Sequence, residues 1–291
     1  MTNEQKHEIR LLTIDFVKSH RSQNQAAASL IGVSSATLTQ VKNENWQLIS
    51  DEMWHKLGKQ VGYTAPDWVY TDTAVSKKII SHMQLARDRK VSNISSIIAP
   101  AGSGKTFTAD YFASQCKDAI LVKCKRGLTV RKLYKLILRS MGFNPEGYRM
   151  DDLEEMIYTR ITKRANPTLI LDEIDKANPE VWLELICLYN EFKDKCNIVT
   201  LSTPTFRTKI ENGVRSGRLG FDELHSRLGG SFIDVGSPDS FAVAAISVAN
   251  GVADPSLISK ITESCIRMEK CDLRVGSDTI KAIKLKQNKA A

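Results

Sequence analysis

The stretch Ile94-Ser-Ser-Ile-Ile-Ala-Pro-Ala-Gly-Ser-Gly-Lys-Thr106 joins an apolar run to a glycine-containing loop, and a helical pattern follows the loop. The apolar run predicts a buried strand, and this strand-loop-helix order is the context of a phosphate-binding loop. Gly102 and Gly104 free the backbone, so that successive N–H groups can converge on phosphate oxygens at a helix N-terminus. The stretch therefore predicts an α/β domain that binds a nucleotide through its phosphates.

The residues of this loop have separate predicted tasks. Lys105 would bring a point charge to the β- and γ-phosphates, and the Thr106 hydroxyl would ligate Mg²⁺. Ala99 stands where the motif usually has its first glycine, a position that only has to be small. ATP and Mg²⁺ are the expected cofactors. The predicted nucleotide contacts are Ala99, Pro100, Ala101, Gly102, Ser103, Gly104, Lys105, Thr106 and Phe107.

A second apolar run, 168–171, ends in the two carboxylates Asp172 and Glu173. Asp172 at the strand's end would hold the Mg²⁺ shell, and Glu173 would orient and deprotonate the attacking water. A glutamate beside the Mg²⁺ aspartate favours the branch of P-loop ATPases that carry an extra strand between this strand and the P-loop strand. The pair therefore predicts ATP hydrolysis, with Lys105 and Glu173 as catalytic residues.

From residue 78 onward, apolar runs alternate with helical patterns, which predicts a parallel sheet covered on both faces. We place the ATPase core at 78–236. Beyond it, amphipathic patterns predict three helices near 239–249, 255–268 and 272–285, which would form a small helical lid over 237–291. The predicted strands are 94–98, 119–122, 168–171, 198–201 and 232–235.

The first 65 residues predict a separate all-α domain, joined to the core by a linker at 66–77. Helices are expected at 3–20, 23–31, 35–43 and 51–61, with Ser34 and Ser50 as N-caps. Residues 22–46 resemble the helix-turn-helix of repressor-type DNA-binding domains, and a plain helical bundle is the alternative. If the resemblance holds, the third helix would enter the major groove and present Ser35, Thr37, Thr39, Gln40, Lys42 and Asn43.

The formal net charge of +8 is unevenly distributed along the chain. Residues 1–65 hold seven Lys/Arg against six Asp/Glu, which weighs against strong independent DNA binding by the front domain. Residues 117–139 hold eight Lys/Arg against one Asp, so they indicate either a polyanion partner or a solvated helix face. A second basic segment, 207–218, could supplement this cluster. The predicted DNA contacts are Lys123, Lys125, Arg126, Arg131 and Lys132.

Together, the segments APAGSGKT, LILDE, LST, HSR and CDLR and the front helix-turn-helix resemble the AAA+ ATPases of DNA transposition, the phage Mu B target-DNA-activator family. The resemblance spans about residues 5–285. It implies a P-loop AAA+ domain with a five-stranded parallel sheet and a small C-terminal helical lid, preceded by a helix-turn-helix domain. It also implies double-stranded DNA bound without strong sequence preference, a transposase as partner, and self-association into an ATP-dependent ring or helical filament.

The same resemblance implies roles for three further residues. Thr203, or else Ser202, corresponds to the polar sensor 1 residue beside the γ-phosphate. Arg227, or else Arg218, corresponds to the arginine finger that reaches the ATP of a neighbouring subunit. Arg274 corresponds to sensor 2 in the lid.

Two other functions use the same motifs. A replication initiator or helicase loader shares the ATPase core, and a nucleotide-sensing transcription regulator would read an operator with the helix-turn-helix. The carboxylate pair counts against a sensor that does not hydrolyse ATP. The sequence contains no apolar run of 18 residues, no secretory pattern and no CxxC spacing, so we expect a cytoplasmic protein without a zinc site.

Overall fold

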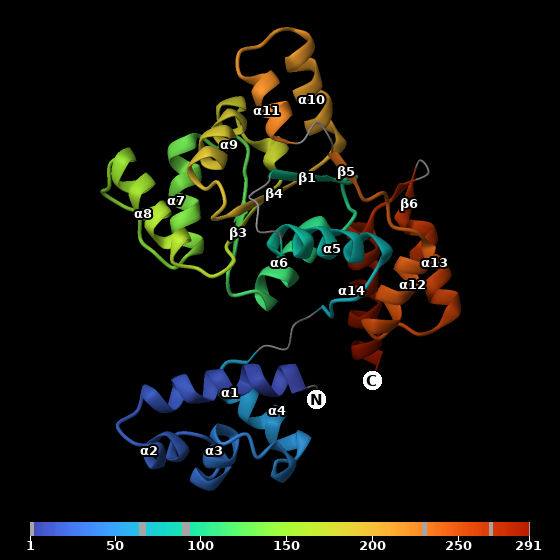
Figure 1. Ribbon diagram of the computed structural model, residues 1–291. Helices are drawn as coiled ribbons and strands as arrows, with labels where there is room; N and C mark the ends of the chain where they lie inside the picture. The colour runs from blue at the N-terminus through green and yellow to red at the C-terminus, as the bar shows by residue number, and fades with distance from the viewer. Residues whose placement is uncertain (1–2, 64–67, 89–93, 229–231, 268–269, 291) are drawn as a thin grey trace. The chain divides into compact units, whose positions relative to one another are not determined.

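The computed structural model describes residues 3–63, 68–88, 94–228, 232–267 and 270–290 (Figure 1). The chain forms two compact units, Met1–Val69 and Tyr70–Ala291. No helix in the described part of the chain is both long enough and apolar enough to cross a membrane.

The front unit is a helical domain with a single core. The Ser34 and Ser50 hydroxyls accept the N–H groups of Thr37 and Met53, at 3.1 and 3.3 Å, so the two predicted N-caps form. Trp54 is fully buried at the centre of the core. The four predicted helices are present, and the first two end two to three residues earlier than expected. The elements are α1 (Asn3–Lys18), α2 (Gln23–Ala28), α3 (Ser35–Lys42), the 3-10 turn η1 (Trp46–Leu48) and α4 (Asp51–Gln60).

The second unit is built on a five-stranded parallel sheet with the order β2-β3-β4-β1-β5. Strand β4 lies between the P-loop strand β1 and the carboxylate strand β3, so the predicted extra strand is confirmed. The five predicted strands all form, to within one residue at each end. They are β1 (Ile94–Ile98), β2 (Ala119–Lys123), β3 (Thr168–Asp172), β4 (Asn197–Ser202) and β5 (Phe232–Asp234).

Helices cover both faces of this sheet (Figure 1). Successive strand side chains point to opposite faces: Ile170 packs under α5 and α6, whereas Leu169 and Leu171 pack under α7 to α11. Helix α5 begins inside the range 66–77 that we predict as a linker, so residues 74–77 are helical. The helices are α5 (Ala74–Asp88), α6 (Lys105–Gln115), α7 (Val130–Ser140), α8 (Met150–Thr162), the 3-10 turn η2 (Ile174–Lys176), α9 (Pro179–Glu191), α10 (Pro204–Arg215) and α11 (Phe221–Arg227).

The C-terminal part contains the three expected helices, α12 (Ser240–Ala249), α13 (Pro255–Cys265) and α14 (Leu273–Ala290). The predicted second helix ends early, because β6 (Ile266–Arg267) pairs antiparallel with β7 (Lys270–Cys271). The Asp272 N–H donates to the Cys265 carbonyl oxygen at 3.0 Å and closes this small sheet. The sequence predicts helices alone over 237–291, and this small sheet shows that the prediction was wrong on that point. A two-residue strand leaves too short a pattern to be recognised in a sequence.

Candidate functional site

The phosphate-binding loop connects β1 to α6 in a tightly constrained conformation. Gly102 and Gly104 have φ angles of +76° and +89°, which glycine adopts without strain. The Lys105 ammonium is buried and donates to the carbonyl oxygens of Ala99 and Pro100, each at 2.7 Å. Burial lowers the pKa of Lys105, while the nearby Asp172 opposes the shift. The loop thus concentrates one positive charge and several backbone N–H groups at the N-terminus of α6.

The carboxylate of Asp172 lies fully buried at the end of β3. Its Oδ1 accepts the Glu173 N–H at 3.0 Å, and its Oδ2 has no hydrogen-bond partner within the described structure. Burial raises the pKa of this carboxyl group, and the Thr106 hydroxyl opposes the rise. A carboxylate oxygen without a partner beside a hydroxyl matches the oxygen ligands that Mg²⁺ prefers. The residues therefore fit the predicted ion, which Asp172 and Thr106 would hold.

Glu173 has a left-handed backbone, with φ +57° and ψ +37°. For a residue with a side chain this conformation is strained, and such strain is concentrated at functional sites. The conformation turns the chain out of β3 into η2. The Glu173 carboxylate is 30% exposed and pairs with the Lys176 ammonium at 2.5 Å. Glu173 therefore lies at the rim of the site, next to the buried Asp172 but in a different environment.

The end of β4 meets the segment after β3 through a hydrogen bond. The Thr203 hydroxyl donates to Asp175 Oδ2 at 2.6 Å, and the Asp175 charge in turn acts on the pKa of Lys105. Ser202, the second candidate for sensor 1, is fully buried, and its hydroxyl has no partner within the described structure. Our sequence reasoning missed Asp175, although it follows Glu173 by two positions in an acidic segment.

The start of α14 lies directly against the phosphate-binding loop. The Leu273 N–H donates to the Gly102 carbonyl oxygen at 2.9 Å. A Cβ atom on Gly102 would lie 2.1 Å from Asp272 Oδ1, so only glycine fits there. The Arg274 N–H donates to the same Asp272 oxygen, and the Arg274 charge lowers the pKa of Lys105. The structure thus brings the predicted sensor 2 residue to the loop, and it adds Asp272, which our sequence reasoning missed.

Phe107 lies at one end of an aromatic stack on α6. The Tyr70 ring is parallel to the Tyr111 ring, with centroids 3.6 Å apart, and its centroid lies 6.0 Å from that of Phe107. Phe107 is 40% exposed. Tyr70 and Tyr111 are therefore two further aromatic neighbours of the loop that the motif alone did not indicate.

Neither candidate for the arginine finger contacts the phosphate-binding loop of its own chain within the described structure. The Arg227 guanidinium lies 4.9 Å from the centroid of the Tyr189 ring and 3.4 Å from Glu223 Oε1. Arg218 is exposed in the turn after α10. Arg227 is thus the last residue of α11, and Arg218 lies in the turn between α10 and α11.

Two of the five predicted DNA contacts already have partners within the protein, and three are exposed without an ion pair among the described residues. The Lys123 ammonium pairs with Asp110 at 2.7 Å, and Arg131 donates to the Tyr148 carbonyl oxygen at 2.9 Å. The remaining three, Lys125, Arg126 and Lys132, are exposed and have no ion-pair partner among the residues that the structure describes. The basic loop 124–129 begins beside the magnesium ligand predicted in β3, since the Cys124 N–H donates to the Asp172 carbonyl oxygen at 2.8 Å.

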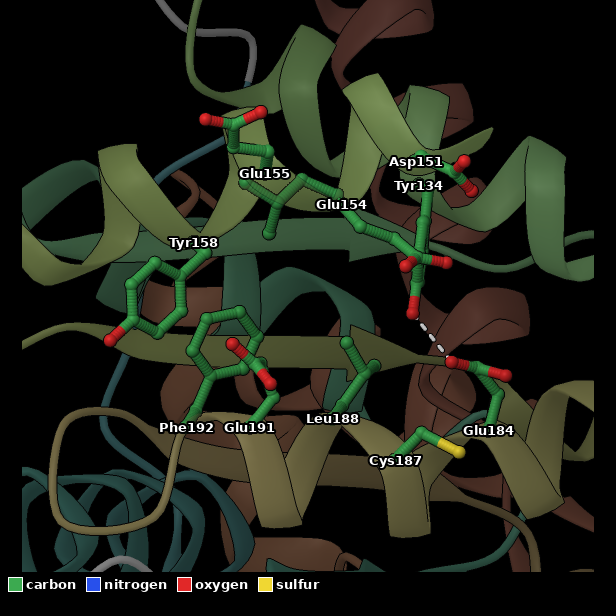
Figure 2. A pocket seen from close by; sticks show the side chains of 11 residues that line it. Tyr134, Asp151, Glu154, Glu155, Tyr158, Glu184, Cys187, Leu188, Glu191 and Phe192 are labelled. Carbon is green, nitrogen blue, oxygen red and sulfur yellow. Dashed lines mark hydrogen bonds between the residues drawn. The ribbon is translucent and has the colours of Figure 1, made fainter. Parts of the chain in front are cut away.

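A pocket of about 590 Å³ between α8 and α9 has the opposite charge (Figure 2). The Tyr134 hydroxyl donates to Glu184 Oε1 at 2.5 Å, and burial raises the pKa of Glu184. Such a surface repels a polyanion. The carboxylates that line the pocket are Asp151, Glu154, Glu155, Glu184 and Glu191.

In the front unit, the helix predicted to read DNA has one exposed face. Leu38 and Val41 of α3 are buried in the core, whereas Thr39, Lys42 and Asn43 are exposed. The Gln23 side-chain amide donates to the Thr39 hydroxyl at 2.8 Å and holds α2 against α3. Of the other predicted contacts, Ser35, Thr37 and Gln40 are half-buried.

Comparisons with known proteins gave one family match and similar solved structures. The family model described as an AAA domain matches residues 88–210. Among solved structures, a chain of Drosophila ORC bound to DNA is similar, with a TM-score of 0.49 and 15% sequence identity. The similarity covers 78% of this chain and 59% of that chain, so this chain spans less than two thirds of its length. A search of curated proteins found no match.

The sheet order, the phosphate-binding loop and the AAA-domain match define the class of protein. The second unit has the α/β P-loop fold of AAA+ proteins, as the sequence predicts. An AAA domain is a P-loop NTPase domain, so nucleotide binding belongs to this region of the chain.

Proposed function

We propose that this protein is an ATP-dependent DNA-binding ATPase that assembles on target DNA and delivers it to, or activates, a transposase. One arrangement carries the proposal. The basic loop 124–129 is hydrogen-bonded to Asp172, beside Glu173 and the phosphate-binding loop. DNA held by this basic loop would therefore lie close to the groups that bind and hydrolyse ATP.

Hydrolysis would use separate residues for charge and for proton transfer. Lys105 would stabilise the charge on the transferred phosphoryl group, and Asp172 with Thr106 would hold Mg²⁺, which neutralises the phosphate oxygens when bound. Glu173 would accept the proton of the attacking water. The different environments of the two carboxylates support this division, because Asp172 is buried and Glu173 is partly exposed.

Nucleotide state would be read by residues at the borders of the site. Thr203, hydrogen-bonded to Asp175, would act as sensor 1, and Arg274 in α14 would act as sensor 2. The Leu273 bond to the loop supports coupling between bound nucleotide and the position of the C-terminal helices. Arg227, or Arg218 as second choice, would serve the ATP of a neighbouring subunit. The contacts of Arg227 with Tyr189 and Glu223, away from the phosphate-binding loop, support this role.

DNA binding would depend on phosphate contacts more than on base contacts. The exposed side chains of Lys125, Arg126 and Lys132 support a backbone-tracking role without sequence preference. The transposase, and assembly into a ring or filament, follow from the combination of this ATPase with a front helix-turn-helix and a short lid. Release of the DNA would follow hydrolysis.

Electron microscopy of the protein with long duplex DNA tests the proposal. With a non-hydrolysable ATP analogue, continuous protein assemblies should cover the DNA, and without nucleotide the DNA should be largely bare. The Lys105→Ala variant is the control and should leave the DNA bare in both conditions. Equal coverage with and without nucleotide would contradict ATP-dependent assembly.

A further inference from the structure

A second pocket, of about 680 Å³, lies between the start of α9 and α10. We refer to it as the α9–α10 pocket. Three of its lining side chains are cationic, and none is acidic. This composition is the reverse of the pocket between α8 and α9 shown in Figure 2. The side chains that carry the argument are Asn178, Trp182, Lys209, Asn212, Arg215 and Arg218.

Among the described residues, no cation that lines this pocket forms an ion pair with a carboxylate, although the charge of Glu211 acts on Arg215. Arg215 donates to the Asn212 side-chain oxygen at 2.7 Å, and Arg218 is exposed without an ion-pair partner among the described residues. The nearby Glu211 is paired with Arg207 at 2.7 Å. Glu180, exposed in the first turn of α9, does not line the pocket. Two guanidinium groups thus remain available to an anion.

The rest of the pocket is held firmly in place. The Trp182 ring N–H donates to the Ile174 carbonyl oxygen at 2.9 Å. The Lys209 ammonium lies 5.4 Å from the centroid of the Trp182 ring. Gly213 of α10 faces the ring of Phe221, where an added Cβ would lie 2.0 Å from a ring carbon. This close contact fixes α10 against α11, and it fixes the direction in which the end of α10 carries the arginines.

A hydrogen bond joins this pocket to the basic loop 124–129. The Asn178 N–H donates to the Leu128 carbonyl oxygen at 3.3 Å. The Asn178 side chain lines the pocket and forms no capping bond to α9, so its amide is available to a ligand. Two basic segments that are far apart in the sequence, 123–132 and 207–218, therefore meet at Asn178.

We propose that the α9–α10 pocket binds phosphate groups of double-stranded DNA, adjacent to the phosphates held by Lys125 and Arg126. Guanidinium groups suit this ligand, because their planar donors can bind two phosphate oxygens at once. The acidic pocket farther along α9 repels the same polyanion, so the two pockets together orient the duplex on the unit. This inference rests on the proposed function and assigns it a second contact surface.

Fluorescence anisotropy with a labelled random-sequence duplex, measured over a series of salt concentrations with a non-hydrolysable ATP analogue, tests the pocket. Each lost phosphate contact lowers the slope of log affinity against log salt by roughly one unit. The double variant Arg215→Ala/Arg218→Ala should therefore lower the slope by about two units and weaken binding by about tenfold or more. The variant Arg215→Lys/Arg218→Lys should keep the slope.

The matched control is Lys163→Ala/Lys193→Ala, which removes two exposed cations outside the pocket. It should change affinity by less than about twofold, since charges away from the DNA are screened at a distance of roughly 10 Å. Nucleotide binding and thermal midpoints of all variants show whether they are folded.

The outcomes separate this inference from the proposed function. An unchanged slope in Arg215→Ala/Arg218→Ala, together with a lower slope in Lys125→Ala/Arg126→Ala, would overturn the pocket and leave the proposed function intact. An equal loss of DNA affinity in Arg215→Ala/Arg218→Ala and in the control Lys163→Ala/Lys193→Ala would also overturn the pocket as a DNA site, because the change in net charge alone would then explain the loss. If the wild-type chain binds no DNA with the ATP analogue, the proposed function itself fails.

Discussion

The front unit, Met1–Val69, and the second unit, Tyr70–Ala291, which we call the ATPase unit after its proposed function, differ in how they could engage DNA. The front unit is the part that we predict to read DNA with a helix-turn-helix, and it has its own hydrophobic core around Trp54, yet residues 1–65 have seven Lys/Arg against six Asp/Glu. We predict no reading helix in the ATPase unit, but it holds the dense basic segment 117–139 and the two exposed arginines of the α9–α10 pocket, Arg215 and Arg218. The predicted base-reading helix thus lies in one unit, and most of the positive charge suited to DNA phosphates lies in the other.

This division indicates where affinity and selectivity would arise. Affinity for duplex DNA depends mainly on phosphates neutralised, and this favours the ATPase unit. Base recognition requires side chains in a groove, and the exposed face of α3 is the one that we predict to supply them. We therefore expect nucleotide to control the main DNA affinity, and the front unit to modulate it.

The largest effect is expected for Lys105→Ala. Loss of the buried ammonium removes the charge that faces the phosphates, so nucleotide affinity should fall by about a hundredfold or more, as for a charged group left without its partner. ATP-dependent DNA binding should disappear with it, although the front unit is untouched. Titration with a fluorescent ATP analogue and duplex anisotropy measure both. Undiminished DNA affinity would mean that the front unit carries the binding.

The second largest effect is expected for Glu173→Gln, and it concerns ATP hydrolysis. This change removes the proposed base but retains the size of the side chain, so hydrolysis should fall by about 10² to 10³-fold while ATP binding persists. DNA complexes formed with ATP should then dissociate more slowly than those of the wild type. Steady-state ATPase assays and competitor-chase experiments measure the two properties. Wild-type turnover by this variant would exclude Glu173 as the base.

Trp54→Ala tests the independence of the two units. Trp54 is fully buried in the front core, so its truncation should destabilise that unit by about 3 to 5 kcal/mol. The proposed ATPase activity, which we assign to the other unit, should remain close to that of the wild type. Thermal unfolding with two transitions, combined with ATPase assays, checks this expectation. A parallel loss of ATPase activity would show that the units depend on one another.

Asp172→Asn should stabilise the ATPase unit while abolishing hydrolysis. Burial raises the pKa of Asp172, so folding disfavours its charged form at every pH above that raised pKa. Removing the charge should therefore raise the melting temperature at neutral pH. The gain should shrink as the pH falls through the raised pKa, and it should vanish well below the ordinary value of 3.8, where the carboxyl is protonated in both states. A lower melting temperature at neutral pH would contradict this reasoning.

The smallest effect is expected from deletion of residues 1–65. Because this segment has nearly balanced charge, ATP-dependent affinity for random-sequence duplex should change by less than about fivefold, with the salt slope preserved. Fluorescence anisotropy with the shortened chain and with the full chain measures the affinity of each for the duplex and its dependence on salt. If the deletion abolishes ATP-dependent binding, DNA is held by the helix-turn-helix, and the operator-reading regulator becomes the better function.

Several features could be predicted because their cause is local. The strand before Ala99, the glycines at 102 and 104, and the carboxylates after 168–171 occur in short segments whose chemistry depends on spacing alone. The N-caps at Ser34 and Ser50 are local in the same way. Asp175 and Asp272 were missed because their roles depend on partners, Thr203 and Gly102, that are distant in sequence.

By itself, the sequence determined the fold class, the five strands and the phosphate-binding loop, because hydrophobic period and glycine placement act over a few residues. Only the tertiary structure decided which side chains meet at the site. Backbone hydrogen bonds connect Leu273 to Gly102 and Asn178 to Leu128. Lys123 pairs with the Asp110 carboxylate, whereas Lys125 and Arg126 remain exposed. These pairings follow from the sheet order and helix packing, which bring together segments that share no local signal.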